Sequence, residues 1–360
     1  MSNQKEKAYA KAGVDIALAE SLLDDVKPEI KKATRPEVLG SVGGFGGLFD
    51  ISRTGLANPT LVSSTDSVGT KVKVASMAKC YKNLGFDIVN HCSNDIAVVG
   101  AEPLFFLDYF ATSKLEAQSY KDLITSVAQA CQAGNVALIG GETAELPGVY
   151  AESEFDLVGT IVGVCDKAKL LSGSTIQEGD QLIGVASSGL HTNGFSLARK
   201  ILFTDLGLTA TDALPGSDMT IGEALLQPHV NYALLLKHLY EAYNQGESSL
   251  QRDGNHVFGV AHITGGGITG NLPRILPEGI GAQVNTTSWK RLPIFDYLAA
   301  EGGVDYEELH QVFNMGIGLI LVVSPEKADA VLGSVIAEGF SAYHIGSITQ
   351  GDRTVKIFEA

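Results

Sequence analysis

The sequence of 360 residues lacks long apolar runs and has few cysteines. No stretch reaches the ~18 apolar residues of a membrane-spanning helix, and the polar start MSNQKEKAYAKAG lacks the apolar segment of a secretory signal. The four cysteines show no CxxC spacing, so we expect reduced, mostly buried thiols. These absences predict a cytoplasmic protein with no membrane partner.

Positive charge is also scarce. Lys and Arg number 26 against 41 Asp and Glu, which gives a net charge of -15. Nucleic acids require basic stripes, so we expect no nucleic-acid partner, whereas a small phosphorylated ligand needs only a local pocket. A hydrophobic content of 45% is ordinary for a folded core, and this length predicts two domains, which we place at residues 1–167 and 168–360.

The sequence contains neither GxxxxGK[ST] nor GxGxxG, the common nucleotide-binding loops. It does contain a glycine cluster around Phe45. Glycines allow backbone N–H groups to approach a phosphate closely, so this cluster is a candidate phosphate loop. A flexible loop without a ligand is the alternative. The candidate residues are Gly43, Gly44, Gly46 and Gly47.

The most informative stretch runs from residue 86 to residue 111. Apolar residues at helical spacing predict a helix over 86–100, and Gly100 and Pro103 end it. A polar stripe gathers on one side of the same helix. An Asp in so apolar a helix needs a donor, a cation or a metal as partner, although a solvated helix face is the alternative. The stripe consists of Asp87, His91, Asn94 and Asp95.

Acidic residues also follow two predicted strands. The strand 60–65 leads into Asp66 and a Gly69-Thr70-Lys71 turn, which together offer a carboxylate, donors and a point charge. The strand 136–139 leads into Gly140, Gly141 and Glu142. Carboxylates that share a pocket repel one another unless a cation lies between them. We therefore predict one Mg²⁺-nucleotide site with Asp66, Asp95 and Glu142 as ligands, the alternative being unrelated helix caps.

The second half repeats the pattern of strand, small-residue loop and helix. The loop Ser187–Gly194 follows the strand 182–186, and Thr264–Gly267 follows the strand 257–263. Loops at helix N-termini favour anions, and His191 and Asn193 add donors. A helix cap with an incidental histidine is the alternative. The recurrence predicts α/β layering with ligands at the carboxyl ends of strands.

The strand Leu104–Ala111 is apolar on both faces. The helices predicted at 86–100 and 115–134 can cover one face, which leaves the other exposed. A second copy of the chain is the simplest cover, so we predict a homodimer through the first sheet. The alternative is that the second domain folds over this face.

The motifs together resemble the phosphoribosylformylglycinamidine cyclo-ligases, also called aminoimidazole ribonucleotide synthetases. The resemblance covers nearly the whole chain, through RPEVLGSVGGFGGLFD, SSTDSVGTK, NHCSNDIAVVGAEPLFFLDY, GGETAELPGVY, SSGLHTNGFSLARK and HITGGG. Two positions depart from the family's usual residues, Ser67 in place of glycine and Leu190 in place of proline. Selenophosphate synthetases and thiamine-phosphate kinases share single motifs such as the Gly-Gly-Glu.

The resemblance implies a two-domain α/β fold. Its N-terminal domain has a small mixed sheet, backed by helices, that joins the sheet of a dimer mate, and its C-terminal domain is a layered α/β domain. It also implies ATP-dependent ring closure of formylglycinamidine ribonucleotide in purine biosynthesis. Another ATP-using enzyme of the superfamily and a non-catalytic nucleotide-binding regulator are the alternatives, and the Asp66, Lys71 and Asp95 set speaks against the regulator.

The resemblance further implies roles for the candidate residues. ATP and Mg²⁺ are the expected cofactors. The expected catalytic residues are Asp66, Lys71, Asn94, Asp95 and His191. Gly69, Thr70, Lys71 and the two glycine segments are expected to bind ATP. The expected substrate-binding residues are Ser187, Ser188, Gly189, His191, Asn193, Gly194, Thr264, Gly265, Gly266 and Gly267.

Overall fold

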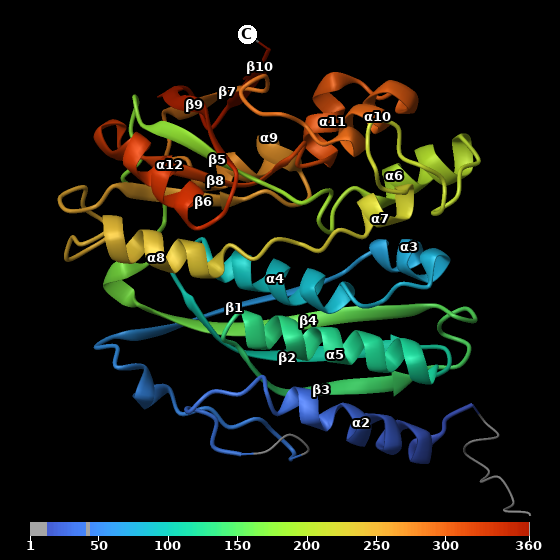
Figure 1. Cartoon of the computed structure of the whole chain (residues 1–360). Helices are drawn as coiled ribbons and strands as arrows, with labels where there is room; N and C mark the ends of the chain where they lie inside the picture. The colour runs from blue at the N-terminus through green and yellow to red at the C-terminus, as the bar shows by residue number, and fades with distance from the viewer. Residues whose placement is uncertain (1–12, 41–43, 360) are drawn as a thin grey trace, which may run out of the picture.

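The computed structural model describes residues 13–40 and 44–359, and it contains two sheets, each packed against helices (Figure 1). The first sheet lies within residues 59–166 and the second within residues 181–358. The predicted mixed α/β fold is confirmed. The expected domain boundary at residue 167 falls in the segment between the two sheets.

The first sheet has four strands in the order β1-β4-β2-β3. Strands β1 and β2 pair antiparallel with β4, and β2 pairs parallel with β3. Helices α4 and α5 pack on each other beside the sheet, and α2 packs on α5 (Figure 1). The strands are β1 (Pro59–Ser67), β2 (Glu102–Thr112), β3 (Ala137–Glu145) and β4 (Phe155–Asp166), and the helices are α2 (Ile16–Ile30), α3 (Lys71–Ala78), α4 (Leu84–Ala97) and α5 (Ala117–Ala133).

Two local features differ from the sequence prediction. Gly140, Gly141 and Glu142 lie inside β3 and not in a loop, because the pairing of β3 with β2 continues as far as Glu145. In the sequence, Pro28 indicates a break within the segment that forms α2. Pro28 nevertheless lies within the helix, which begins at the side-chain cap Asp15.

The second sheet has six strands in the order β10-β7-β9-β5-β8-β6. Every neighbouring pair is antiparallel except β10 and β7. Helices α8 and α12 pack on one face through residues such as Leu236 and Val331, and α9 packs on the other through Ile268. The strands are β5 (Gln181–Ala186), β6 (Val257–His262), β7 (Ile280–Asn285), β8 (Ile317–Val323), β9 (Ala342–Gln350) and β10 (Val355–Phe358).

The remaining helices connect the strands of the second domain. A single apolar cluster runs from α4 and α5 of the first domain to Phe195, Leu225 and Phe295 of the second. The two domains therefore share part of their core. The helices are α6 (Phe195–Arg199), a π-helix (Lys200–Asp205), α7 (Ile221–Leu225), α8 (Ala233–Tyr243), α9 (Gly267–Asn271), α10 (Pro293–Gly302), α11 (Tyr306–Val312) and α12 (Ala328–Ala337).

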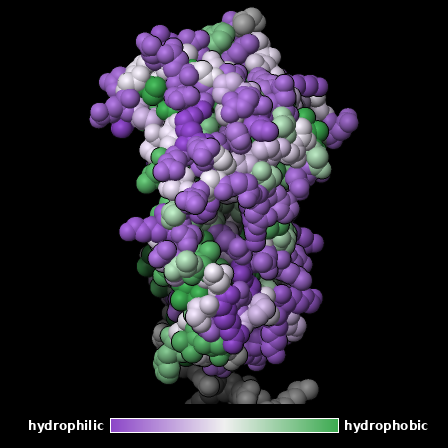
Figure 2. Space-filling model, turned by 90° about the vertical axis from the view of Figure 1, so that its left-hand side faces the viewer, coloured by the Kyte–Doolittle hydropathy of each residue, from purple (hydrophilic) through white to green (hydrophobic). Residues whose placement is uncertain are grey.

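The two faces of the first sheet differ in exposure. Phe106 and Ile161 are buried on the face that α4 and α5 cover. On the other face Leu61 is 60% exposed, and Phe105 and Val162 are partly exposed. Figure 2 shows apolar side chains at the surface of the lower half of the molecule, which is the first domain. Within the described part of the chain, no helix combines the length and apolarity needed to cross a membrane.

Candidate functional site

Helix α4 lies between the first sheet and the second domain (Figure 1), and side chains of its polar stripe are hydrogen-bonded to residues of the second domain. The side chain of Asn94 donates to the carbonyl of Val230 (2.8 Å) and accepts from the backbone N–H of Tyr232 (2.7 Å). One turn earlier, Asn90 donates to the carbonyl of His229 (2.7 Å). The segment 229–232 that enters α8 is thus held by α4, and Asn94, which is fully buried, uses both ends of its amide for this contact.

Lys71, which is paired with Asp87 of the same domain, forms a second contact with the second domain. The Lys71 ammonium donates to the Asp87 carboxylate (2.8 Å) and to the carbonyls of His191 (2.9 Å) and Gln227 (2.7 Å). Both side chains are fully buried. Burial raises the pKa of Asp87 to about 6, and the ammonium of Lys71 limits that rise. The three donors of Lys71 are therefore occupied by protein, and its expected contact with a phosphate stays a prediction.

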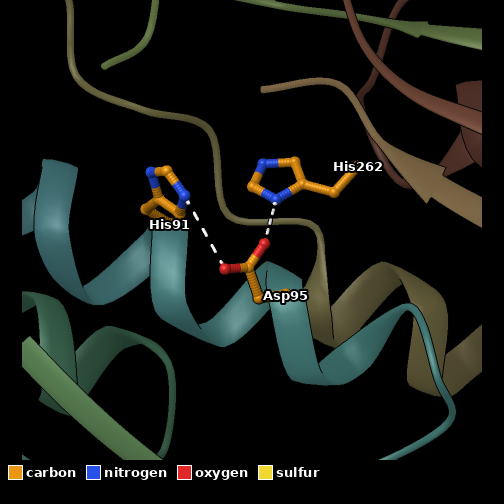
Figure 3. Close-up of side chains that lie close together, drawn as sticks. All are labelled: His91, Asp95 and His262. Carbon is orange, nitrogen blue, oxygen red and sulfur yellow. Dashed lines mark hydrogen bonds and ion pairs between the residues drawn. The ribbon is translucent and has the colours of Figure 1, made fainter. Parts of the chain in front are cut away.

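Histidines and carboxylates from both domains meet above α4. His91 Nε2 lies 2.9 Å from Asp66 Oδ2, and His91 Nδ1 lies 2.7 Å from Thr192 Oγ1. His262, at the end of β6, reaches Asp95 Oδ1 through its Nδ1 (2.8 Å; Figure 3). Its other nitrogen lies 2.9 Å from His229 Nε2. We use the name histidine cluster for the following residues: His91, His191, His229 and His262, with Asp66, Asp95 and Thr192.

Burial and the neighbouring carboxylates set the charges in this cluster. Burial lowers the pKa of His262, which the hydrogen bond to Asp95 partly offsets, and lowers the pKa of His229 and of His191 well below the ordinary value. Burial also opposes protonation of His91, but Asp66 and Asp95 outweigh it and raise the pKa of His91. Asp66 and Asp95 have lowered pKa values, because their hydrogen bonds to histidine outweigh the effect of burial.

The cluster offers ligands for a cation. Ligand atoms of His91, Asp95 and His262 all lie within 4.8 Å of one another (Figure 3). The Asp66 carboxylate adjoins them through His91 and is 41% exposed. Mg²⁺ prefers carboxylate oxygens, so the Asp95 carboxylate of this set suits the expected ion, whereas Asp66 lies outside the set and stays a predicted ligand. Glu142 does not join these two acids within one chain, because it lies on β3, at the opposite edge of the sheet from Asp66 on β1.

The two predicted loops of the second domain lie side by side. A Cβ placed on Gly265 would come 3.2 Å from the Asn193 side-chain oxygen. The Asn271 amide ties the second loop together through the carbonyls of Thr264, Gly265 and Gly267. Position 267 must be glycine, since its φ is +58° and a Cβ there would lie 1.9 Å from the His310 carbonyl oxygen.

The first of these loops is anchored from behind. Ser187 Oγ donates to Asn314 (3.1 Å), and Ser188 Oγ donates to the carbonyl of Pro228 (2.5 Å). His191 has a positive φ of 60° and is buried, with its ring stacked on His229 at a centroid distance of 3.9 Å. Among the described residues its Nδ1 has no hydrogen-bond partner. The His191 ring therefore lies in the interior of the interface, behind the loop.

The residues expected to bind ATP fall into two groups. Gly44, Gly46, Gly47, Gly140, Gly141 and Glu142 line one cavity of about 420 Å³ at the β3 edge of the first sheet. Gly69 and Thr70 lie instead at the start of α3, where Thr70 Oγ1 is 3.1 Å from Ser196 Oγ of the second domain. Gly43 lies outside the described residues.

Sequence reasoning did not single out Thr192, His229 or His262. His262 belongs to the motif HITGGG, and the sequence near it holds no acidic residue that would indicate a partner. Its partner Asp95 lies 167 positions away. A histidine that ends a fully buried strand is the signal that could have pointed to it, since buried polar groups need partners.

Comparison with known families covers nearly the whole chain. Residues 53–165 match the N-terminal domain model of AIR synthase related proteins, and residues 177–358 match the C-terminal domain model. A phosphoribosylformylglycinamidine cyclo-ligase of Geobacillus kaustophilus is 47% identical over 345 residues, which is 96% of each chain. One of Syntrophotalea carbinolica is 43% identical and covers 99% of this chain and 100% of its own.

Solved structures share the fold at low identity. The hydrogenase maturation protein HypE in complex with ATP has a TM-score of 0.66 at 17% identity and covers 95% of this chain and 91% of its own. A thiamine-monophosphate kinase from Stenotrophomonas maltophilia has a TM-score of 0.65 at 17% identity, covering 94% and 96%. These two likenesses concern the fold, whereas the curated relatives identify the family. The chain belongs to the AIR synthase related family and, within it, to the phosphoribosylformylglycinamidine cyclo-ligases.

Proposed function

We propose that the protein uses ATP to close the imidazole ring of formylglycinamidine ribonucleotide, giving aminoimidazole ribonucleotide, ADP and phosphate in purine biosynthesis in the cytoplasm. The observation that carries the proposal is identity of 43% or more to cyclo-ligases over nearly the full length of both chains. ATP phosphorylates the formyl oxygen and makes it a leaving group. The amidine nitrogen then attacks the formyl carbon, and phosphate departs.

The chain's own residues would bind, orient and neutralise charge, as is usual in phosphoryl transfer. Asp66 and Asp95 would hold Mg²⁺, which when bound would neutralise phosphate charge. The Ser187–Gly194 and Thr264–Gly267 loops would hold the ribonucleotide, a proposal supported by the closeness of the Asn193 side chain to Gly265. The glycine residues at the β3 edge would cover the nucleotide. His191 and His229, which burial keeps neutral, would support the Ser187–Gly194 loop from the interior of the interface.

We also propose a homodimer through the open face of the first sheet. Its support is the contrast between the two faces, with Leu61 60% exposed and the opposite face buried. Glu142 pairs with Tyr109 on this open face, so the dimer would place it at the interface. Glu142 could then lie near a nucleotide at the dimer interface, although it is far from Asp66 of its own chain.

The reaction is tested by mixing the purified protein with formylglycinamidine ribonucleotide, ATP and Mg²⁺ and measuring the products. We expect ADP and aminoimidazole ribonucleotide in equal amounts, and no ADP above background when the ribonucleotide is omitted. Release of ADP with thiamine phosphate instead would indicate a kinase of the same fold. Absence of turnover with either substrate, from folded protein that binds ATP, would contradict the proposal.

A further inference from the structure

The cavity at the β3 edge, named here the edge cavity, has one apolar side and one acidic side. Leu23, Ile30, Ile124, Leu138 and Ile139 provide the apolar wall. Glu20, Asp108 and Glu142 also line it, and no Lys, Arg or His does so among the described residues. A pocket with this charge repels phosphate groups but suits a flat ring that carries N–H donors.

Asp108 is the distinctive group of this cavity. It lies in the middle of β2, and in the described part of the chain its carboxylate has a hydrogen bond from its own backbone but no charged partner. Burial raises its pKa to about 7. A carboxylate that is held in such a place without a cation destabilises the fold, so packing does not explain it. Perturbed groups of this kind gather at functional sites.

The surroundings leave room for the Asp108 carboxylate and keep it facing the cavity. Gly141 lies directly opposite on β3, and a Cβ there would come 2.3 Å from Asp108 Oδ1. Glycine at position 141 is thus required by the acid and not by a turn. The hydroxyls of Tyr120 and Thr143 in the described lining are already hydrogen-bonded to each other at 3.3 Å. Of the three acids in that lining, Glu20 and Glu142 are exposed to solvent, so Asp108 is the most buried carboxylate acceptor of the cavity.

We propose that the edge cavity takes the adenine end of the nucleotide and that Asp108 accepts the hydrogen bond of the adenine 6-amino group. Asp108 is then the residue that selects ATP over other nucleoside triphosphates. The inference rests on the proposed use of ATP and adds the orientation of the nucleotide. The adenine lies against the apolar wall, and the phosphates lie outside the acidic part of the cavity.

The test measures nucleotide binding to the full-length protein without the ribonucleotide substrate. ATP is compared with purine riboside triphosphate, which lacks the 6-amino group, with 2′-deoxy-ATP and with inosine triphosphate. We expect the wild type to prefer ATP over purine riboside triphosphate by ~10–100-fold, the range of one hydrogen bond to a charged group. Asp108→Ala should lower ATP affinity by that factor, leave purine riboside triphosphate unchanged and so abolish the preference.

Asp108→Asn provides the conservative variant. Its amide oxygen still accepts from the amino group, so ATP binding should be partly retained. Its N–H₂ can donate to the 6-oxo group of inosine triphosphate, whose binding should improve relative to ATP. Asp122→Asn is the matched control, because that carboxylate lies on α5 and bonds Gln118 on the solvent side. It should change none of the four affinities.

The possible outcomes separate the two proposals. If Asp108→Ala lowers the affinities for ATP and purine riboside triphosphate equally, or lowers neither, Asp108 does not contact the 6-amino group and the inference is wrong. If the variant instead abolishes the preference for ATP over 2′-deoxy-ATP, the acid contacts the ribose and the adenine assignment is overturned. A wild type that selects ATP through Asp108 but releases no ADP with formylglycinamidine ribonucleotide would refute the proposed reaction alone.

Discussion

At the scale of single residues, the interface between the domains holds acids and histidines whose pKa values depart from their ordinary values. His191 and His229 are kept neutral by burial, while Asp66 and Asp95 are kept ionised by histidine partners. Each state has a measurable consequence for stability or activity. The first prediction concerns Asp95, which contacts both His262 and Ser64.

Asp95→Asn should lower turnover by at least ~100-fold at saturating Mg²⁺, the scale of removing one electrostatic group from an active site. The physical reason is that an amide cannot neutralise a divalent ion. ADP release under initial-rate conditions is the measurement. Asp218→Asn is the control, because that side chain is exposed on the surface of the second domain. Near-normal turnover of the Asp95 variant would show that Asp95 is not a metal ligand.

The second prediction concerns acid stability. Burial holds the folded-state pKa of His191 and of His229 below that of the unfolded chain, so only the unfolded chain binds these protons as pH falls below about 6.5. Each histidine therefore removes about 1.4 kcal/mol of unfolding free energy per pH unit below that point. Three groups oppose this with at most one proton each: Asp87 and Asp108, whose pKa values are raised to about 6 and about 7, and His91, whose pKa is raised by its neighbouring acids.

Denaturant titrations between pH 7.5 and 5.5 measure how the unfolding free energy depends on pH, and His229→Gln should remove about one proton of the loss on the acid side, relative to the wild type. His344→Gln serves as the comparison, since His344 is exposed on β9. If the wild type and His229→Gln have equal slopes, His229 is not the buried neutral base inferred from its contacts.

At the scale of elements, strands and helices with strong periodicity could be predicted from sequence. The helix expected at 86–100 corresponds to α4, and the polar residues predicted to share one side of it do so, on the side toward the second domain. Partners distant in sequence could not be predicted, because the pairing of Asp95 with His262 depends on how two domains pack. The position of Glu142 inside β3 depends on its register with β2, which no local signal specifies.

The third prediction tests the pair of loops in the second domain. Asn193→Ala should raise the KM for formylglycinamidine ribonucleotide by ~10-fold, the loss of about one hydrogen bond, because Asn193 lies where the two loops meet. ATP affinity should stay unchanged. Gln350→Ala, an exposed amide on β9, is the control. A fall in ATP affinity instead would show that these loops hold the nucleotide.

At the scale of the whole molecule, the open face of the first sheet predicts the assembly. Covering a few hundred Å² of apolar surface at ~25 cal/mol per Å² is favourable by several kcal/mol before association costs. Light scattering at micromolar concentration should give twice the mass of 37.9 kDa. Val162→Lys, in the middle of the face, should give the single-chain mass, whereas Leu250→Lys, at an exposed site in the second domain, should not. A monomeric wild type would refute the dimer.

The contact of Lys71 with Asp87, His191 and Gln227 also bears on how such a chain can evolve. Two family models describe its halves, yet the buried ammonium of one half is neutralised in its own domain and hydrogen-bonded by backbone of the other. The halves are therefore not interchangeable modules. A chimera that joins residues 1–167 to the second half of a distant relative would have to reproduce these two carbonyl positions to keep the Lys71 ammonium hydrogen-bonded.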